Sequence, residues 1–182
     1  FANKKQVLQA ESIHLHWVSG GFIGLNSLLQ LVELEKPIYW SLHDMSPLTG
    51  LCHNPIDCDR FQTGCGACPR LDSSSQDDLS SWLLKKKYMI LANADIRVIA
   101  PSKWMADQAR KSYLFQHKKV DILPNPIDTN YFHRIDNHES SRFLKHYDPS
   151  KVNIAFGAHN SSPQKGLNFF IDALNQLAEY EN

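Results

Sequence analysis

The residues best suited to chemistry follow an apolar run in the first third of the 182-residue chain. His43 and Asp44 come directly after residues 38–42 (IYWSL), a run rich in β-forming side chains. An imidazole titrates near neutral pH and a neighbouring carboxylate can orient it, so the two are a candidate general acid–base pair. An alternative of equal weight is that Asp44 caps a loop beside a histidine with no chemical role.

A second histidine group lies in the alternating run 13–18 (IHLHWV), which is typical of a strand. Alternate residues of a strand point to the same side, so His14 and His16 share one face, with Trp17 next to them. Two such histidines can ligate a metal or contact a substrate. Taken alone, the pattern favours a plainer alternative, a hydrogen-bonded pair in a half-buried sheet.

All four cysteines lie within seventeen residues, at Cys52, Cys58, Cys65 and Cys68. Four thiolates can complete a tetrahedral zinc shell, and the C-x2-C half has the spacing of a zinc knuckle, whereas the C-x5-C half has no standard spacing. A structural zinc ion and free or buried thiols are equally favoured, and disulfides are less so because a reducing cytoplasm is expected.

Two lysine motifs are the remaining candidates for chemistry or binding. Lys165-Gly166 opens an amphipathic segment, and a helix N-terminus beside a lysine suits a phosphate or diphosphate, although a solvated loop lysine fits equally well. Lys85-Lys86-Lys87 is interpreted as the solvated face of a helix, with peripheral contact to an anionic membrane as the less favoured alternative.

Strand and helix patterns alternate along the chain and must position these residues. The expected fold class is therefore α/β, a Rossmann-like parallel sheet with flanking helices. In such sheets ligands bind at the carboxyl ends of the strands, where Ser102, Lys103 and Asn125 are also placed as substrate contacts. Strands are expected at 13–18, 38–42, 96–100, 120–123 and 152–157, and helices at 25–32, 79–94, 102–112, 140–146 and from 166 onward.

Composition excludes several classes of protein. Nineteen basic residues balance nineteen acidic ones, so the chain lacks the positive excess that nucleic-acid binding requires. No run of eighteen apolar residues could cross a membrane, and a cytoplasmic location, at most peripheral to the inner membrane face, is expected.

In its motifs the sequence resembles the retaining glycosyltransferases of family 4, which have the GT-B architecture, and in particular their bacterial polysaccharide-biosynthesis branch. The resemblance covers nearly the whole chain, in this order: residues 13–17 (IHLHW), 42–45 (LHDM), 49–53 (TGLCH), 64–69 (GCGACP), 100–104 (APSKW) and 122–128 (ILPNPID).

The resemblance implies a transferase that moves a sugar from a nucleotide-sugar donor to a hydroxyl of a glycan or lipid-linked acceptor. It implies an acceptor-side domain over residues 1–125, with a Cys-rich loop at 45–76, and the start of a donor-binding domain over 126–182. By motif match, His43 lies near the transferring sugar and Lys165 meets the donor diphosphate. No cofactor is required for the chemistry, and any zinc is structural.

Departures from the family pattern put activity of this chain alone in doubt. The family's first strand with its Gly-rich loop is absent, loop 157–166 has no arginine, and no Glu-x7-Glu element follows. The chain is thus expected to be an inactive fragment of an enzyme. The competing hypothesis is a non-catalytic Cys/His-rich module on a Rossmann scaffold that binds metal or a partner.

Overall fold

The structure is a computed structural model that describes residues 2–135, 148, 150–160 and 162–180. It separates into two compact units, Phe1–Pro126 and Ile127–Asn182.

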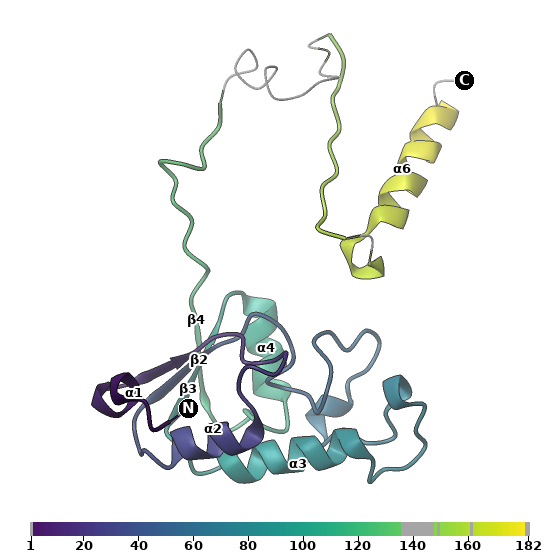
Figure 1. Ribbon diagram of the computed structural model, residues 1–182. Coiled ribbons are helices and arrows are strands. Elements are labelled where there is room, and N and C mark those ends of the chain that lie inside the picture. Colours follow the sequence, from purple (N-terminus) through teal and green to yellow (C-terminus); the bar gives the residue numbers. More distant parts are fainter. Residues whose placement is uncertain (1, 136–147, 149, 161, 181–182) are drawn as a thin grey trace. The chain divides into compact units, whose positions relative to one another are not determined.

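The first unit is built on a four-stranded sheet, drawn in Figure 1 with its flanking helices. The strands are β1 (Ile13–Leu15), β2 (Ile38–Ser41), β3 (Ile96–Ala100) and β4 (Lys119–Ile122), in the spatial order β1-β2-β3-β4. Every pair is parallel, which confirms the predicted α/β fold class. Because all four strands run the same way, their carboxyl ends lie along a single edge of the sheet.

The core lies where the central strands are covered. Burial alternates along β2 and β3, with Ile38 and Trp40 inward on one and Val98 on the other. Trp40 is 2% exposed and meets Phe115 edge to face, with ring centroids 6.2 Å apart. An aromatic pair of this geometry contributes about 0.5–1.5 kcal/mol beyond the area it buries.

Four helices accompany this sheet: α1 (Lys5–Gln9), α2 (Leu25–Val32), α3 (Leu79–Leu91) and α4 (Lys103–Lys111). Helices α2 and α3 pack side by side (Figure 1). The predicted cap at Ser102 is confirmed, because its hydroxyl accepts the Met105 N–H and begins α4. Helix α1 was not predicted, and the loop after β2 contains single 3₁₀ turns at η1 (Arg60–Gln62) and η2 (Pro69–Leu71).

The buried side of α3 differs from the sequence prediction. Leu79 and Trp82, expected on the apolar side, are 53% and 52% exposed, whereas Ser80 and Ser81 are buried. Asp78 explains the change, because its carboxylate accepts the N–H groups of both serines and the Ser80 hydroxyl, which removes the cost of burying them.

In the second unit the predicted strand at 152–157 does not form. These residues belong to no strand, because the described part of this unit offers no neighbouring strand to complete a hydrogen-bonded ladder. Phe156 instead stacks on Phe170 at 5.0 Å. The predicted last helix is present as α6 (Leu167–Tyr180), preceded by the 3₁₀ turn η3 (Pro163–Lys165), and the helix predicted at 140–146 lies outside the described residues.

None of the helices in the described residues combines the length and the hydropathy needed to cross a membrane.

Gly50 offers a test of how the long loop packs on α3. A Cβ at this position would lie 2.1 Å from the Ser80 carbonyl oxygen. We expect Gly50→Ala to lower the free energy of unfolding by about 1–3 kcal/mol, the usual cost of overpacking, in urea denaturation. Gly157→Ala is the control, since a Cβ there meets nothing within 4 Å. Equal stability of the two variants would contradict this packing.

Candidate functional site

The candidate site lies at the carboxyl edge of the sheet, just past β1 and β2. His16 follows the last residue of β1, and His43 comes two residues after the end of β2. Their rings are stacked with centroids 5.3 Å apart, and Nδ1 of His16 lies 3.0 Å from Nε2 of His43. Both side chains are exposed, so the pair faces solvent at the edge where parallel sheets bind ligands.

A constant spacing links the two segments that leave the sheet here. Four side-chain hydrogen bonds join residues 27 positions apart: His14–Ser41, His16–His43, Trp17–Asp44 and Ser19–Ser46. The two segments therefore stay side by side after the backbone ladder ends. We call these four pairs the side-chain ladder.

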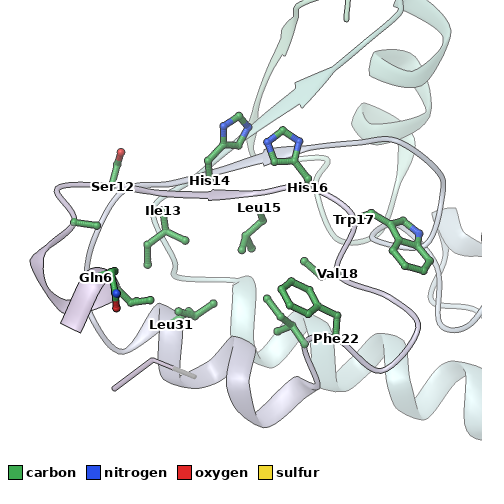
Figure 2. Close-up of a pocket in the computed structure, with 13 residues that line it drawn as sticks. Gln6, Ser12, Ile13, His14, Leu15, His16, Trp17, Val18, Phe22 and Leu31 are labelled. Carbon is green, nitrogen blue, oxygen red and sulfur yellow. The ribbon is translucent and has the colours of Figure 1, made fainter. Parts of the chain in front are cut away.

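The histidines form a row along one face. His14 and His16 lie with ring centroids 4.2 Å apart, and Nε2 of His14 is 2.9 Å from the Ser41 hydroxyl. In Figure 2 both imidazoles project from one side of β1, while Ile13 and Leu15 project from the other. The shared face predicted for His14 and His16 is thus confirmed, and the row extends to His43.

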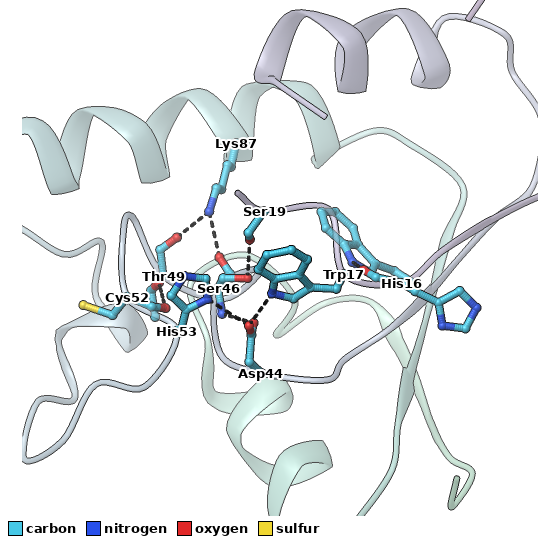
Figure 3. A network of polar contacts seen from close by, with 10 residues as sticks. His16, Trp17, Ser19, Asp44, Ser46, Thr49, Cys52, His53 and Lys87 are labelled. Carbon is cyan, nitrogen blue, oxygen red and sulfur yellow. Dashed lines mark hydrogen bonds and ion pairs between the residues drawn. The ribbon is translucent and has the colours of Figure 1, made fainter. Parts of the chain in front are cut away.

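Asp44 is the centre of a second cluster, shown in Figure 3. Its Oδ2 accepts the Trp17 indole N–H at 2.9 Å and lies 2.9 Å from Nδ1 of His53, while Oδ1 accepts the Ser46 N–H at 2.8 Å. Burial opposes ionisation of this carboxyl, yet the hydrogen bonds from Ser46, His53 and Trp17 outweigh it and lower its pKa. Asp44 therefore stays a carboxylate at neutral pH.

The loop that carries Asp44 is also held by a side chain of α3. The Lys87 ammonium donates to the carbonyls of Ser46 at 2.8 Å and Thr49 at 2.7 Å (Figure 3). Burial lowers the pKa of Lys87 to about 8. The solvated face predicted for the three lysines is accordingly wrong at this position, because two buried carbonyls need a donor there.

The structure changes the pairing expected from the sequence. His43 is bonded to His16, whereas the adjacent Asp44 carboxylate turns to Trp17 and His53. Sequence reasoning missed His53 as a member of the site. The available signal was its place beside Cys52 in the stretch 49–53, and only the folded loop shows that its ring stacks on Trp17 at 6.1 Å.

The other residues predicted for the site belong to other elements of the first unit or to the second unit. The Ser102 hydroxyl is engaged as the cap of α4, Lys103 is exposed beside it, and Asn125 is exposed beyond β4. Lys165 is exposed at the end of η3, in the second unit. Gly166 follows it with φ at +75°, a left-handed conformation that glycine adopts without strain, and directly precedes α6.

A mostly apolar pocket of about 360 Å³ lies along β1, and its lining includes residues of the histidine row, His14 and His16. Leu15, Phe22 and Leu31 contribute to its lining, as Figure 2 shows. Because Phe22 is 63% exposed, the pocket is open to solvent at this side chain. It offers shape and apolar contact but no charged group.

The four cysteines are the residues most suited to hold a metal. All four are reduced thiols, and Cys68 is the most buried of them. Among the described residues, no three His, Cys, Asp or Glu side chains already stand at the spacing of a bound ion.

Comparison with known proteins shows the family to which the chain belongs. The model of Glycosyltransferase Family 4 matches residues 3–131. The Escherichia coli (strain K12) protein WcaC, named as a colanic acid biosynthesis glycosyl transferase, is 26% identical over 127 residues, which are 64% of this chain and 31% of that protein. The chain thus spans about a third of the length of this relative. No solved structure matches the chain significantly.

The His14 ring allows a test of the histidine row. Burial, followed by the charges of His16 and His43, lowers the pKa of His14 from its ordinary 6.5. The unfolded chain then binds this proton more readily, so stability should fall as the pH drops below 6.5. We expect His14→Gln to make the decline between pH 7 and pH 5 shallower in urea denaturation. An unchanged or steeper decline would contradict the row.

Proposed function

The chain belongs to glycosyltransferase family 4, and we propose that it serves the transfer of a sugar from a nucleotide-sugar donor to a hydroxyl acceptor. The observation that carries the proposal is the exposed His16–His43 pair at the carboxyl edge of the parallel sheet. The name of the similar WcaC protein further supports a role in polysaccharide or glycan biosynthesis.

His43 is proposed to contact the transferring sugar. Its Nε2 is engaged by His16, so Nδ1 is the nitrogen left to face a substrate, with no hydrogen-bond partner in the described part of the chain. The hydrogen bond between Nδ1 of His16 and Nε2 of His43 needs a hydrogen on one of these two nitrogens. The tautomer of His16 therefore decides whether Nδ1 of His43 is a donor or an acceptor towards the substrate. This makes His16 a positioning residue for His43.

The acceptor is proposed to dock on the first unit, beside Trp17. The Trp17 side chain is 50% exposed, and the Asp44 carboxylate and the His53 ring hold it in place. An exposed ring with a fixed plane offers an apolar face on which a sugar can stack. Asp44 then acts by orienting Trp17 and His53, and a glycan or a lipid-linked sugar would suit this surface.

The donor diphosphate is proposed to meet Lys165. In the transfer, the bond from the anomeric carbon to the diphosphate oxygen breaks and its electron pair leaves with the diphosphate. The acceptor oxygen forms the new bond on the same face, which retains the configuration, and the acceptor proton passes to the departing diphosphate. Lys165 and the N–H groups that open α6 stabilise that negative charge, so the chemistry requires no metal.

On this proposal residues 1–125 form the acceptor side and residues 126–182 begin the donor side. The chain covers 31% of WcaC, so a transferase of that length would supply further donor contacts. We therefore expect the 182 residues alone to lack activity, and the tests below use an intact transferase that contains them.

The run Lys85-Lys86-Lys87 gives little support to peripheral membrane contact, because two of its three lysines have partners within the protein. Lys87 is half-buried and bound to two carbonyls, and Lys85 lies 2.7 Å from the Asp77 carboxylate. Lys86 is exposed over the Trp82 ring, with its ammonium 5.8 Å from the centroid. A lipid-linked acceptor, rather than this helix, would be the reason for a location at the inner membrane face.

His43→Ala tests the sugar contact. We expect kcat in the intact transferase to fall by about 10²-fold or more, the scale of a group that acts in the transition state. His117→Ala is the matched control, because His117 is exposed just before β4, at the amino edge of the sheet. Wild-type turnover by folded His43→Ala protein would exclude the role and favour a non-catalytic binding module.

Lys165→Ala tests the donor contact separately. We expect kcat/KM for the nucleotide sugar to fall by an amount equivalent to about 2–4 kcal/mol, the loss of one electrostatic stabiliser. Lys165→Arg should keep much of the rate, because the charge remains, and Gln164→Ala should change little. A change in acceptor KM with normal donor kinetics would place Lys165 outside the donor site.

A further inference from the structure

The loop between β2 and α3 folds with few apolar side chains of its own. Only Met45, Leu48, Phe61 and Cys68 are buried hydrophobic residues within positions 45–76. Of the five non-glycine residues with positive φ in the described chain, four lie here: Asp57, Cys65, Ala67 and Asp72. Left-handed backbone at such residues costs free energy and persists only where the surroundings enforce it. Polar contacts such as the Asp78 bond to the Cys68 N–H therefore share in holding this loop, and a metal ion would add to them.

The strain is centred on the Cys65–Cys68 turn. Gly64, Cys65, Gly66 and Ala67 have consecutive φ values of +124°, +60°, +97° and +42°. The Gly50 N–H donates to Sγ of Cys65 at 3.4 Å. A backbone N–H directed at a cysteine sulfur stabilises negative charge on that sulfur, as a metal-bound thiolate requires.

The four thiols are near one another although they come from separate parts of the loop. Cys65 lies near enough to Cys52, Cys58 and Cys68 to interact electrostatically with each of them. The Cys52 thiol is hydrogen-bonded to Cys68 and also interacts with Cys58. The loop thus converges its four sulfur atoms on one region.

Two cations lie beside these sulfurs. The positive charge of Arg70 acts on Cys52, and the charges of Cys65 and Cys52 act on the buried ammonium of Lys87. Four thiolates around a divalent ion leave a net charge of −2, which a buried site must offset. Arg70 and Lys87 are placed to do so.

We propose that Cys52, Cys58, Cys65 and Cys68 bind one zinc ion that fixes the loop between β2 and α3. An all-thiolate set selects zinc or iron–sulfur chemistry over magnesium or calcium, and four sulfurs suit tetrahedral zinc. Among the described residues no three such side chains already stand at coordination spacing, so an ion at this site would have to draw the four sulfur atoms closer together.

The proposed ion is linked to the candidate site through the backbone of residues 45–53. The Thr49 hydroxyl donates to the Cys52 carbonyl at 2.7 Å, and the Met45 N–H donates to the His53 carbonyl at 2.8 Å. His53 in turn contacts Asp44. Zinc is therefore a structural support for the Asp44 cluster, and its presence does not depend on the proposed sugar transfer.

The test measures metal in the 182-residue chain purified under reducing conditions without added chelator. We expect about one zinc per chain by elemental analysis, and four thiols that react with a thiol reagent only after chelation. Cys58→Ser and Cys65→Ser should each reduce the zinc content to near zero. His53→Ala is the matched control and should keep the zinc, since His53 neighbours Cys52 but is bonded to Asp44.

A second measurement uses the wild-type chain and therefore tests the proposal even if the cysteine variants fail to fold. Refolding the wild-type chain with Co²⁺ should give the strong visible and near-ultraviolet absorption of tetrahedral thiolate ligation, which one equivalent of Zn²⁺ removes. Four freely reacting thiols with no bound metal would overturn the proposal. So would two disulfides under the same conditions, bound iron with its colour, or loss of zinc in His53→Ala.

Discussion

The side-chain ladder between the segments after β1 and β2 is the constraint on which the candidate site depends. A parallel backbone ladder ends at Leu15 and Trp40, but side chains 27 positions apart continue the pairing as far as Ser19 and Ser46. Trp40 anchors it, since its ring is buried in the core and its indole N–H donates to the His16 carbonyl at 3.2 Å. A buried strand therefore fixes the positions of the exposed histidines, and a binding site requires such rigid support.

The long loop is organised by polar contacts in place of a large core. Lys87 binds two carbonyls of the segment that follows Asp44, and Asp78 accepts the Cys68 N–H at 2.8 Å while it caps α3. Both groups lie at or in α3, so this helix acts as the platform for the loop. The proposed zinc ion would stabilise the loop further, because a metal that binds only the folded loop contributes its binding free energy to folding.

Family membership and local geometry support different parts of the functional argument. The match over residues 3–131 establishes the family and covers the histidine row and the Asp44 cluster. It does not reach Lys165, whose proposed role rests on its own position before α6 and on the family resemblance. The proposed acceptor surface of the first unit can thus be tested independently of the donor contact proposed for Lys165.

The sequence by itself determined the elements whose signals are local. Alternating and helical periodicities predicted all four strands of the sheet, α2, α4 and α6 with small changes in their bounds, because burial of one face is written in the spacing of apolar residues. The same reasoning placed His14 and His16 on one face. Tertiary structure alone decided which distant groups meet: His43 pairs with His16 instead of Asp44, and Lys87 turns inward. Residues 152–157 have a strand's sequence, yet they form no ladder with any part of the chain that the structure describes, because a strand needs a partner that its own residues cannot supply.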